Sequence, residues 1–174
     1  MQDLAERLDD TIRDVPDFPK PGILFKDITP VLADPVLMKA TVDHFAKKWA
    51  GEKVDVVVGM ESRGFIFGAP LAMALNAAFA PARKPGKLPY NKIGVEYSLE
   101  YGTNRLEMHT DAVKPGQRVL IIDDLLATGG TAAATVKLVR QLGGNVLGCA
   151  FVLELGFLDG RPKIDVPVES ILVY

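Results

Sequence analysis

The chain is poor in the residues that build disulfides and metal centres. Its 174 residues include one cysteine and two histidines. A single thiol cannot form an internal disulfide, so the sequence favours a reducing, cytoplasmic compartment. Cys149 lies in an apolar run without a polar neighbour, which is typical of a small core residue rather than a nucleophile. The scattered His44 and His109 form no ligand cluster for a metal, and we expect His44 on the surface.

Long apolar runs and an excess of positive charge are also missing. The 20 lysines and arginines are outnumbered by 22 acids, which gives a net charge of -2. A nucleic-acid binder normally carries a basic face. No apolar run approaches the roughly 20 residues of a membrane span. The N-terminus is charged from its third residue, unlike a secretory signal. We therefore expect neither nucleic acid nor a membrane as a partner.

What the chain does contain is enough apolar material for one large core, since 48% of its residues are hydrophobic. Apolar runs typical of parallel strands covered on both faces occur at residues 54–60, 77–83, 117–123, 145–155 and 169–174. Helical patterns occur at residues 3–14, 35–49, 64–77 and 130–142, and Gly143 and Gly144 predict a glycine C-cap for the last of these helices. This alternation predicts a single α/β domain over residues 1–174 with a mostly parallel sheet.

Two segments depart from that alternation. Residues 15–35 contain five prolines, which exclude a regular helix and a central strand, so we expect a stiff irregular segment there. Long ordered loops of this kind are usually functional. Residues 94–101 and 104–113 alternate apolar and polar side chains, which predicts an antiparallel hairpin turned at Gly102.

The segment VLIIDDLLATGGTAAA, from Val119 to Ala134, carries the clearest chemical signal. A buried strand leads to two acids and then to a glycine-rich turn before a helix. Ligands of open parallel sheets bind at the carboxyl ends of strands. Glycine N–H groups, threonine hydroxyls and a helix N-terminus together suit a phosphate monoester. The Gly-Lys-Ser/Thr ending of a nucleotide P-loop is absent, and so is the G-x-G-x-x-G pattern of a dinucleotide site. The expected phosphate cradle consists of Ala127, Thr128, Gly129, Gly130 and Thr131.

The two acids, Asp123 and Asp124, complement that cradle. Carboxylates accept hydrogen bonds, and a cis-diol offers two donors at matching spacing. A role limited to capping the turn would account for one acid but not for both. A sugar with a phosphate at one end and two adjacent hydroxyls satisfies the whole motif, so the segment predicts a ribose 5-phosphate site.

This signature resembles that of the type I phosphoribosyltransferases, which use 5-phosphoribosyl 1-pyrophosphate (PRPP). Five segments are similar, in the same order, to the adenine phosphoribosyltransferase family: DFPKPGILFKDITPVL, ESRGFIFGAPLA, RKPGKLPY, YSLEYG and VLIIDDLLATGGT. The resemblance covers nearly the whole chain. It implies a type I phosphoribosyltransferase-like α/β fold, with a mostly parallel sheet flanked by helices, a small N-terminal hood from about residues 1–35 and a β-hairpin lid.

The resemblance also implies an activity. The family transfers the 5-phosphoribosyl group from PRPP to adenine, giving AMP and pyrophosphate in purine salvage. It implies Mg²⁺ held mainly by PRPP and water, with no direct protein ligand, and a homodimer in the cytoplasm. Two alternatives stay open from the sequence. One is a transferase for another purine, such as xanthine or guanine, and the other is a non-catalytic PRPP- or nucleotide-sensing regulator.

Roles for the remaining residues follow from the resemblance. Glu100 is the family's catalytic acid/base, and Tyr101 belongs to the lid; without the resemblance, Glu100 could be an ordinary surface glutamate. Pyrophosphate is assigned to the 61–63 turn, which often contains a cis peptide in the family, and to the loop from Arg83 to Lys92, here called the basic loop. The pyrophosphate residues are Glu61, Ser62, Arg63, Arg83, Lys84 and Lys87. The adenine residues are Phe25, Lys26, Arg63 and Leu158.

Simpler interpretations exist for parts of these assignments. The 61–63 turn could be an ordinary helix-capping turn with a solvated arginine, and the loop from Arg83 to Lys92 could be a solvated surface loop. An arginine suits bidentate recognition of phosphate oxygens, which favours the functional interpretation of Arg63. Many family members carry arginine where this chain has Lys26. We expect Glu107 to be structural.

Overall fold

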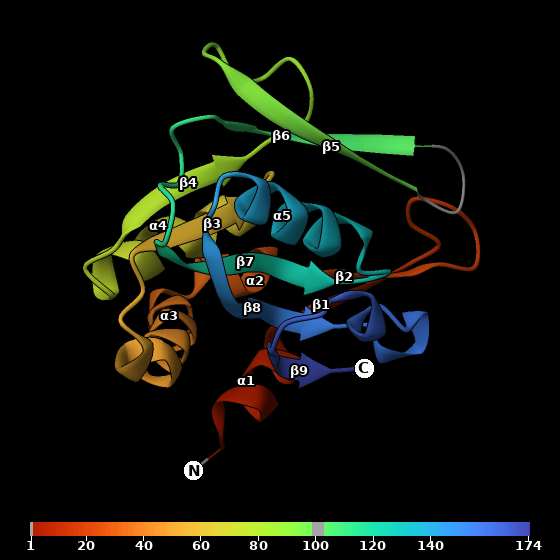
Figure 1. Ribbon diagram of the computed structural model, residues 1–174. Coiled ribbons are helices and arrows are strands. Elements are labelled where there is room, and N and C mark those ends of the chain that lie inside the picture. The colour runs from red at the N-terminus through yellow and green to blue at the C-terminus, as the bar shows by residue number, and fades with distance from the viewer. Residues whose placement is uncertain (1, 99–102) are drawn as a thin grey trace.

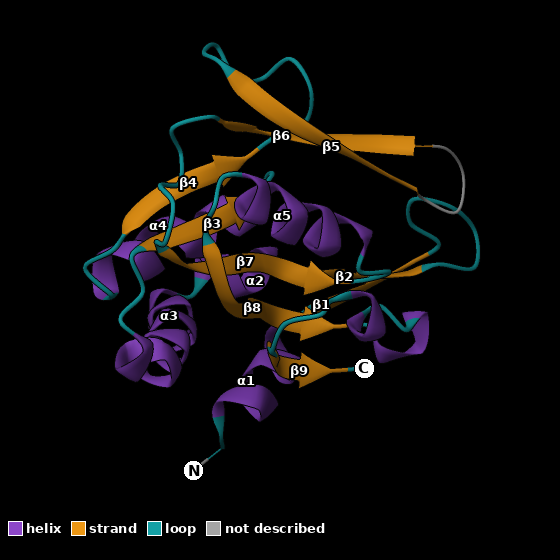
Figure 2. Ribbon diagram, in the orientation of Figure 1, coloured by secondary structure: helices purple, strands orange, loops and turns teal. Residues whose placement is uncertain are grey.

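A five-stranded parallel sheet forms the centre of the computed structural model, which describes residues 2–98 and 103–174 (Figures 1 and 2). The strand order is β4-β3-β7-β8-β9, and each of the four pairings is parallel. The strands are β3 (Val56–Met60), β4 (Ala78–Ala82), β7 (Arg118–Leu126), β8 (Asn145–Glu154) and β9 (Val168–Val173). The predicted strands and their parallel arrangement are confirmed.

Helices cover both faces of the sheet (Figure 2). The helices are α1 (Leu4–Thr11), α2 (Thr29–Ala33), α3 (Pro35–Trp49), α4 (Gly64–Ala74) and α5 (Gly130–Gln141). Helices α1 to α4 pack on one face around Phe45, Phe67 and Leu71, and α5 packs on the other around Val136 and Leu138. None of the helices in the described ranges is long and apolar enough to cross a membrane.

Helix α5 follows β7, and the turn that joins them contains the glycine-rich motif. The helix begins directly after Gly129, which has a φ of 78°. A residue with a side chain would be strained at this φ, and glycine is not. The helix ends in a Schellman motif, in which the Gly144 N–H donates to the Val139 carbonyl and the Gly143 N–H to the Arg140 carbonyl, both at 2.9 Å. The predicted glycine cap is therefore confirmed, and the helix holds its first turn at the carboxyl end of β7.

A β-hairpin stands over α5 (Figure 1). Its strands are β5 (Lys92–Ser98) and β6 (Thr103–His109), paired antiparallel from Lys92↔His109 to Ser98↔Thr103. Leu106 and Met108 of β6 are buried in the same core as α5. The predicted hairpin is confirmed, although its expected turn at Gly102 lies outside the described residues.

The proline-rich segment is more regular than expected. Strand β1 (Arg13–Pro16) pairs antiparallel with β2 (Leu24–Asp27), and α2 follows directly. Regular pairing is possible because Pro19 and Pro21 lie in the connecting turn and Pro16 lies at the end of β1. The prediction of an irregular segment was wrong for residues 15–16, 24–27 and 29–33. The helix expected over residues 3–14 ends at Thr11, and residues 13–14 belong to β1.

The rare residue types occupy buried or half-buried positions. Cys149 is fully buried, and burial raises the pKa of its thiol to about 12, which agrees with the expected inert core residue. His44 is half-buried rather than solvated: it packs edge-on against Phe45, and its Nε2 lies 3.5 Å from a Glu169 carboxylate oxygen. Glu169 belongs to β9, which is distant in sequence, so the sequence pattern of α3 alone could not reveal this contact.

Candidate active site

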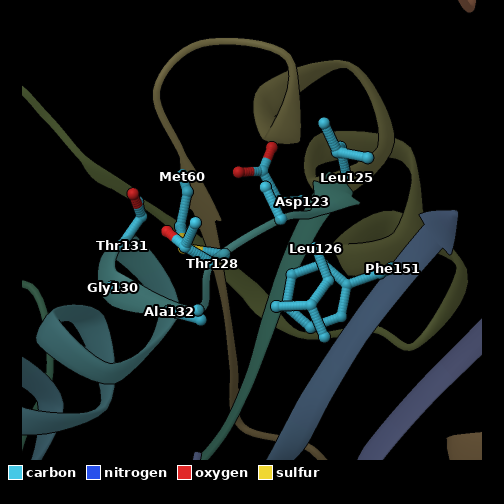
Figure 3. Close-up of a pocket in the computed structure, with 11 residues that line it drawn as sticks. Met60, Asp123, Leu125, Leu126, Thr128, Gly130, Thr131, Ala132 and Phe151 are labelled. Atoms are coloured by element: carbon cyan, nitrogen blue, oxygen red, sulfur yellow. The ribbon is translucent and has the colours of Figure 1, made fainter. Parts of the chain in front are cut away.

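A hollow of about 80 Å³ lies at the carboxyl end of β7 (Figure 3). All five residues of the expected cradle, Ala127 to Thr131, line it, together with Asp123. Figure 3 shows the Thr131 hydroxyl on one side of the hollow and the Asp123 carboxylate on the other. The structure therefore brings together the two halves of the motif that the sequence singles out.

The first turn of α5 offers backbone N–H groups to this hollow. Gly129 is the N-cap residue and supplies no side-chain acceptor, so no side chain caps these donors. The positive end of the helix dipole adds to their attraction for an anion. The Thr131 and Tyr97 hydroxyls lie 3.2 Å apart, which joins the hairpin to the cradle. Such a turn is suited to a phosphate group.

The two acids point in different directions. The predicted strand ended at Asp123, but β7 continues to Leu126 and pairs with β8 beyond both acids. Neighbouring side chains of a strand alternate between faces. Asp123 consequently lines the hollow, whereas Asp124 is only 3% exposed and accepts a 2.8 Å contact from Arg63 Nε.

Burial dominates the electrostatics of this pair. Burial raises the pKa of Asp123 well above its ordinary value, and the neighbouring Asp124 charge raises it further. Burial also raises the pKa of Asp124, while the Arg63 guanidinium opposes that rise. A carboxylate in this situation gains from hydrogen-bond donors such as sugar hydroxyls, which replace the lost water.

The turn before α4 connects the acids to the basic loop. The peptide bond between Glu61 and Ser62 is cis, as the resemblance implies. The Glu61 carboxylate accepts hydrogen bonds from the Lys84 N–H at 2.8 Å and from Arg83 Nε at 3.2 Å. Burial alone would raise the pKa of Glu61, but these two donors outweigh it and lower the pKa. Glu61 thus holds the start of the loop, while Ser62 is exposed.

A second acid, Glu107, holds the middle and end of the basic loop. Its carboxylate is 5% exposed and accepts a hydrogen bond from the Gly86 N–H at 3.3 Å. Lys92 and Arg105 approach it at 3.2 Å and 3.5 Å. These contacts agree with the expected structural role of Glu107. They leave the side chains of Lys84 and Lys87 exposed to solvent.

A larger cavity, of about 610 Å³, lies beside the cradle and shares Thr128 with it. Two of the four residues expected at adenine, Lys26 and Leu158, line it. Its remaining lining residues are mostly apolar: Gly22, Ile23, Leu24, Leu155, Phe157 and Tyr174. Leu24 is 48% and Phe157 73% exposed, and apolar side chains exposed around a cavity are typical of a ligand site.

The other two residues expected at adenine lie outside this cavity's lining. Phe25 occupies the opposite face of β2, because neighbouring strand residues alternate. Its ring meets Phe18 edge-on at 5.1 Å, and the Arg63 guanidinium lies 5.5 Å from its centroid. Phe25 and Arg63 therefore form one contact between the N-terminal hairpin and the 61–63 turn, next to Asp124.

The Lys26 side chain is held at the wall of the large cavity. Its Nζ lies 2.6 Å from an Asp14 carboxylate oxygen and 3.7 Å from the centre of the Tyr174 ring. Sequence patterns did not single out Tyr174, Leu24 or Phe157, because each resembles an ordinary core residue in its own segment. Only the fold brings these segments to one cavity.

Glu100 and Tyr101, the expected catalytic and lid residues, lie outside the described residues. The strands that flank them, β5 and β6, stand over α5, and Tyr97 of β5 contacts Thr131. Within the described ranges, no group of three or more histidines, cysteines and acids could hold a metal ion.

Comparisons with known proteins identify similar chains. Residues 32–168 match the model of the phosphoribosyl transferase domain family. Adenine phosphoribosyltransferase from Sorangium cellulosum is 64% identical over 150 residues, which are 86% of this chain and 75% of the relative. The crystal structure of adenine phosphoribosyltransferase from Thermoanaerobacter pseudethanolicus is 53% identical, with a TM-score of 0.95 over 98% of this chain and 99% of that one.

A third similar protein was solved with bound ligands. It is adenine phosphoribosyltransferase from Saccharomyces cerevisiae, complexed with adenine and an imino-altritol bisphosphate. The two chains are 42% identical, with a TM-score of 0.93 over 97% of this chain and 98% of that one.

Proposed function

The chain belongs to the adenine phosphoribosyltransferase family, and from this premise we propose how its own residues transfer phosphoribose from PRPP to adenine. The reaction gives AMP and pyrophosphate. The observation that carries the assignment of sites is the hollow at Ala127 to Thr131, which combines an uncapped helix start with the Asp123 carboxylate.

The hollow receives the 5-phosphate and the ribose. The N–H groups of the α5 turn and the hydroxyls of Thr128 and Thr131 bind the phosphate. Asp123 faces the same space and accepts hydrogen bonds from the ribose hydroxyls. Asp124 is engaged with Arg63 at 2.8 Å, so its contact with the diol requires that pair to rearrange when PRPP binds. Holding both ends of the sugar fixes its reactive carbon against the base.

The basic loop and the 61–63 turn receive the leaving pyrophosphate. Lys84 and Lys87 are exposed and can approach its oxygens, while Glu61 holds Arg83 and the loop backbone in place. Arg63 offers a planar guanidinium that is 39% exposed beside Asp124. Closure of this positive charge over the site excludes water from the cation-like ribose.

When bound together with PRPP, Mg²⁺ would supply positive charge to the pyrophosphate oxygens. Asp123 is the carboxylate that lines the hollow, and within the described ranges no cluster of three or more metal-binding side chains occurs. One carboxylate suits an ion that keeps most of its waters and binds substrate phosphates. The residues present therefore fit Mg²⁺ held mainly by PRPP and water.

The cavity of about 610 Å³ receives adenine. Leu158 and Phe157 offer apolar surface to the faces of the base. Strand β2 has β1 as its partner in a two-stranded sheet, so alternate backbone groups of its outer edge are available to the rim of the base. Such groups discriminate by hydrogen bonding, since a 6-amino group donates where a 6-oxo group accepts.

The remaining parts complete the proposal. Glu100 acts as the acid/base near the base and the ribose, and Tyr101 closes over them, at the end of a hairpin that already contacts the cradle through Tyr97. We assign residues 1–174 to one domain, with the hood in about residues 1–35. Lys26 belongs to strand β2 of the hood, which pairs with β1. The single cysteine supports a cytoplasmic location.

A homodimer is supported by an apolar patch at the β4 edge of the sheet. Met73 is 83%, Ile66 39% and Phe79 36% exposed, and all three belong to α4 or β4. Exposed apolar patches of this kind mark association surfaces. The chain's own basic loop continues directly from β4, so association there would bring the Arg83 loops of two copies close to the interface.

A base-selectivity assay tests the function. The protein is incubated with PRPP and Mg²⁺ and is offered adenine, hypoxanthine, guanine or xanthine, while nucleotide and pyrophosphate are followed. We expect AMP from adenine and no product from the oxopurines, because an oxopurine leaves polar groups of the pocket unpaired. A nucleotide from another base would overturn the adenine pocket. Bound PRPP without any product would favour the regulator.

A further inference from the structure

The segment from Gly156 to Arg161 touches both hollows of the site. Leu158 lines the large cavity, and two residues later Gly160 lies against the phosphate cradle. A Cβ at Gly160 would overlap the Ala127 carbonyl oxygen, and a Cβ at Gly129 would overlap the Gly160 carbonyl oxygen. The backbones of the segment and the cradle are thus in direct contact, so a shift of one displaces the other.

This segment has little regular structure of its own. It contains the short 3₁₀ turn η2 (Gly156–Leu158) and ends at the first residue of a second, η3 (Arg161–Lys163). Its local hydrogen bonds include the one from the Leu158 N–H to the Leu155 carbonyl at 3.0 Å. Isolated turns of this length are not stable alone. The position of the segment therefore depends on contacts with the rest of the fold.

Arg161 provides the most extensive of these contacts. Its Nε donates to Glu154 Oε1 at 3.1 Å, its Nη2 donates to Glu154 Oε2, and its Nη1 donates to the Val168 carbonyl at 2.9 Å. Glu154 is 5% exposed and also accepts from the Ser170 hydroxyl at 2.7 Å. The forked guanidinium ties the segment to the ends of β8 and β9, and its hydrogen bonds lower the pKa of Glu154.

We propose that Arg161 is a positioning residue, which holds residues 156–160 against the cradle and so fixes the base pocket and the phosphate site in one geometry. The proposal rests on the assignment of those two hollows to adenine and phosphate. Arg161 acts through Leu158 and Gly160, since it is absent from the described lining of both hollows. Its removal disturbs two substrates at once, although they bind at different places.

A purely stabilising ion pair would behave differently, and the chain offers a matched control. Arg140 of α5 pairs with Asp165 at 2.7 Å, in the loop that follows η3. The Arg140 and Arg161 side chains are equally exposed, at 47% and 46%. Arg140 has no contact with the segment from Gly156 to Arg161 among those the structure describes. The acid partners differ, since the Asp165 side chain is 69% and the Glu154 side chain 7% exposed, so the comparison of ligand affinities with Tm, rather than Tm alone, separates positioning from stabilisation.

The test compares Arg161→Lys, Arg161→Ala and Arg140→Ala. Steady-state kinetics give KM for adenine and for PRPP, titration calorimetry gives the affinities for AMP and ribose 5-phosphate, and thermal unfolding gives Tm. We expect Arg161→Ala to lower kcat/KM for both substrates about 10- to 100-fold, because small misplacements are costly. AMP, which spans both hollows, should lose more affinity than ribose 5-phosphate. Arg161→Lys, which lacks the fork, should fall between.

The outcomes are distinguishable. A wild-type protein that makes no AMP overturns the proposed function before any variant is compared. With an active wild type, unchanged affinities in Arg161→Ala together with a lowered Tm would assign Arg161 to stability alone and overturn the inference. If Arg161→Ala does not fold, Arg161→Lys decides: affinities equal to those of wild type and Arg140→Ala overturn the inference, and a joint loss for both ligands supports it.

Discussion

Asp123 and Asp124 are chain neighbours with opposite surroundings. Asp123 lines the hollow, whereas Asp124 is buried against Arg63. The motif itself was visible in the sequence, because two acids followed by a glycine-rich turn serve few other purposes. The division between the acids was not visible, because it depends on β7 continuing to Leu126 beside β8. Arg63 is distant in sequence, and no local pattern links it to Asp124.

The glycines of the cradle offer a test at the scale of one residue. We expect Gly129→Ala to lower the free energy of unfolding by about 2–3 kcal/mol and to weaken PRPP binding strongly, since a Cβ would meet the Gly160 backbone at a φ of 78°. Gly116→Ala is the control, because Gly116 has a φ of 82° with open space around its Cβ position. It should cost about 1 kcal/mol and leave binding unchanged. Equal effects of both changes, measured by denaturation and PRPP titration, would contradict the contact with Gly160.

At the scale of elements, the basic loop is fixed at its base and exposed where it would meet a ligand. The Glu61 carboxylate accepts a hydrogen bond from the Lys84 N–H, and the Glu107 carboxylate accepts one from the Gly86 N–H. Arg83 and Glu107 also exchange two backbone hydrogen bonds, at 2.9 Å and 2.7 Å, which tie the loop to β6. The loop can therefore present its lysines with little loss of backbone entropy on binding.

The buried contacts of Glu107 predict a measurable contribution to stability. We expect Glu107→Gln to lower the free energy of unfolding by about 2–3 kcal/mol, because it leaves Lys92 and Arg105 without their buried partner. Glu96→Gln is the control, since Glu96 pairs with the same Arg105 but is 70% exposed. It should change stability by less than about 0.5 kcal/mol. Similar losses in the two variants, measured by urea denaturation, would show that burial of Glu107 does not matter.

The pH dependence of that loss follows from the pKa of Glu107. Burial would raise this pKa, but the Lys92 ammonium, the Gly86 N–H and Arg105 together hold it below its ordinary value of 4.5. The unfolded chain thus binds more protons than the folded one in this range, so stability falls as the pH falls. The difference between wild type and Glu107→Gln should be full above pH 4.5 and shrink as the pH drops through the folded pKa.

The sequence predicted elements better than it predicted contacts between them. The long apolar runs and the glycine cap of α5 have local causes, so five strands and the bounds of α3, Pro35–Trp49, could be predicted. The β1–β2 hairpin was missed because the prolines of residues 15–35 argued against regular backbone pairing in that segment. Phe25 and Lys26 were both predicted at adenine, but only Lys26 lines the large cavity, because adjacent strand residues face opposite ways and no sequence pattern showed that they share a strand.

At the scale of the whole molecule, the apolar patch on α4 and β4 predicts self-association. We expect Met73→Asp to shift the protein from dimer to monomer in sedimentation experiments, because a charge replaces a side chain that is 83% exposed within one copy. Val36→Asp is the control, since Val36 of α3 is 66% exposed and lies outside the patch. A dimer that survives Met73→Asp, or a wild type that sediments as a monomer, would contradict this surface assignment.

The large cavity takes its walls from segments at opposite ends of the numbering, residues 22–26 and 155–174. The phosphate cradle, in contrast, is a single run from Ala127 to Thr131. During synthesis on the ribosome, the cradle's own residues are complete more than forty positions before Tyr174 is added. A nascent chain therefore contains every group of the turn proposed to bind phosphate while it still lacks one wall of the cavity proposed to bind adenine. On the proposed assignment, the phosphate site is synthesised first and the adenine site is completed last.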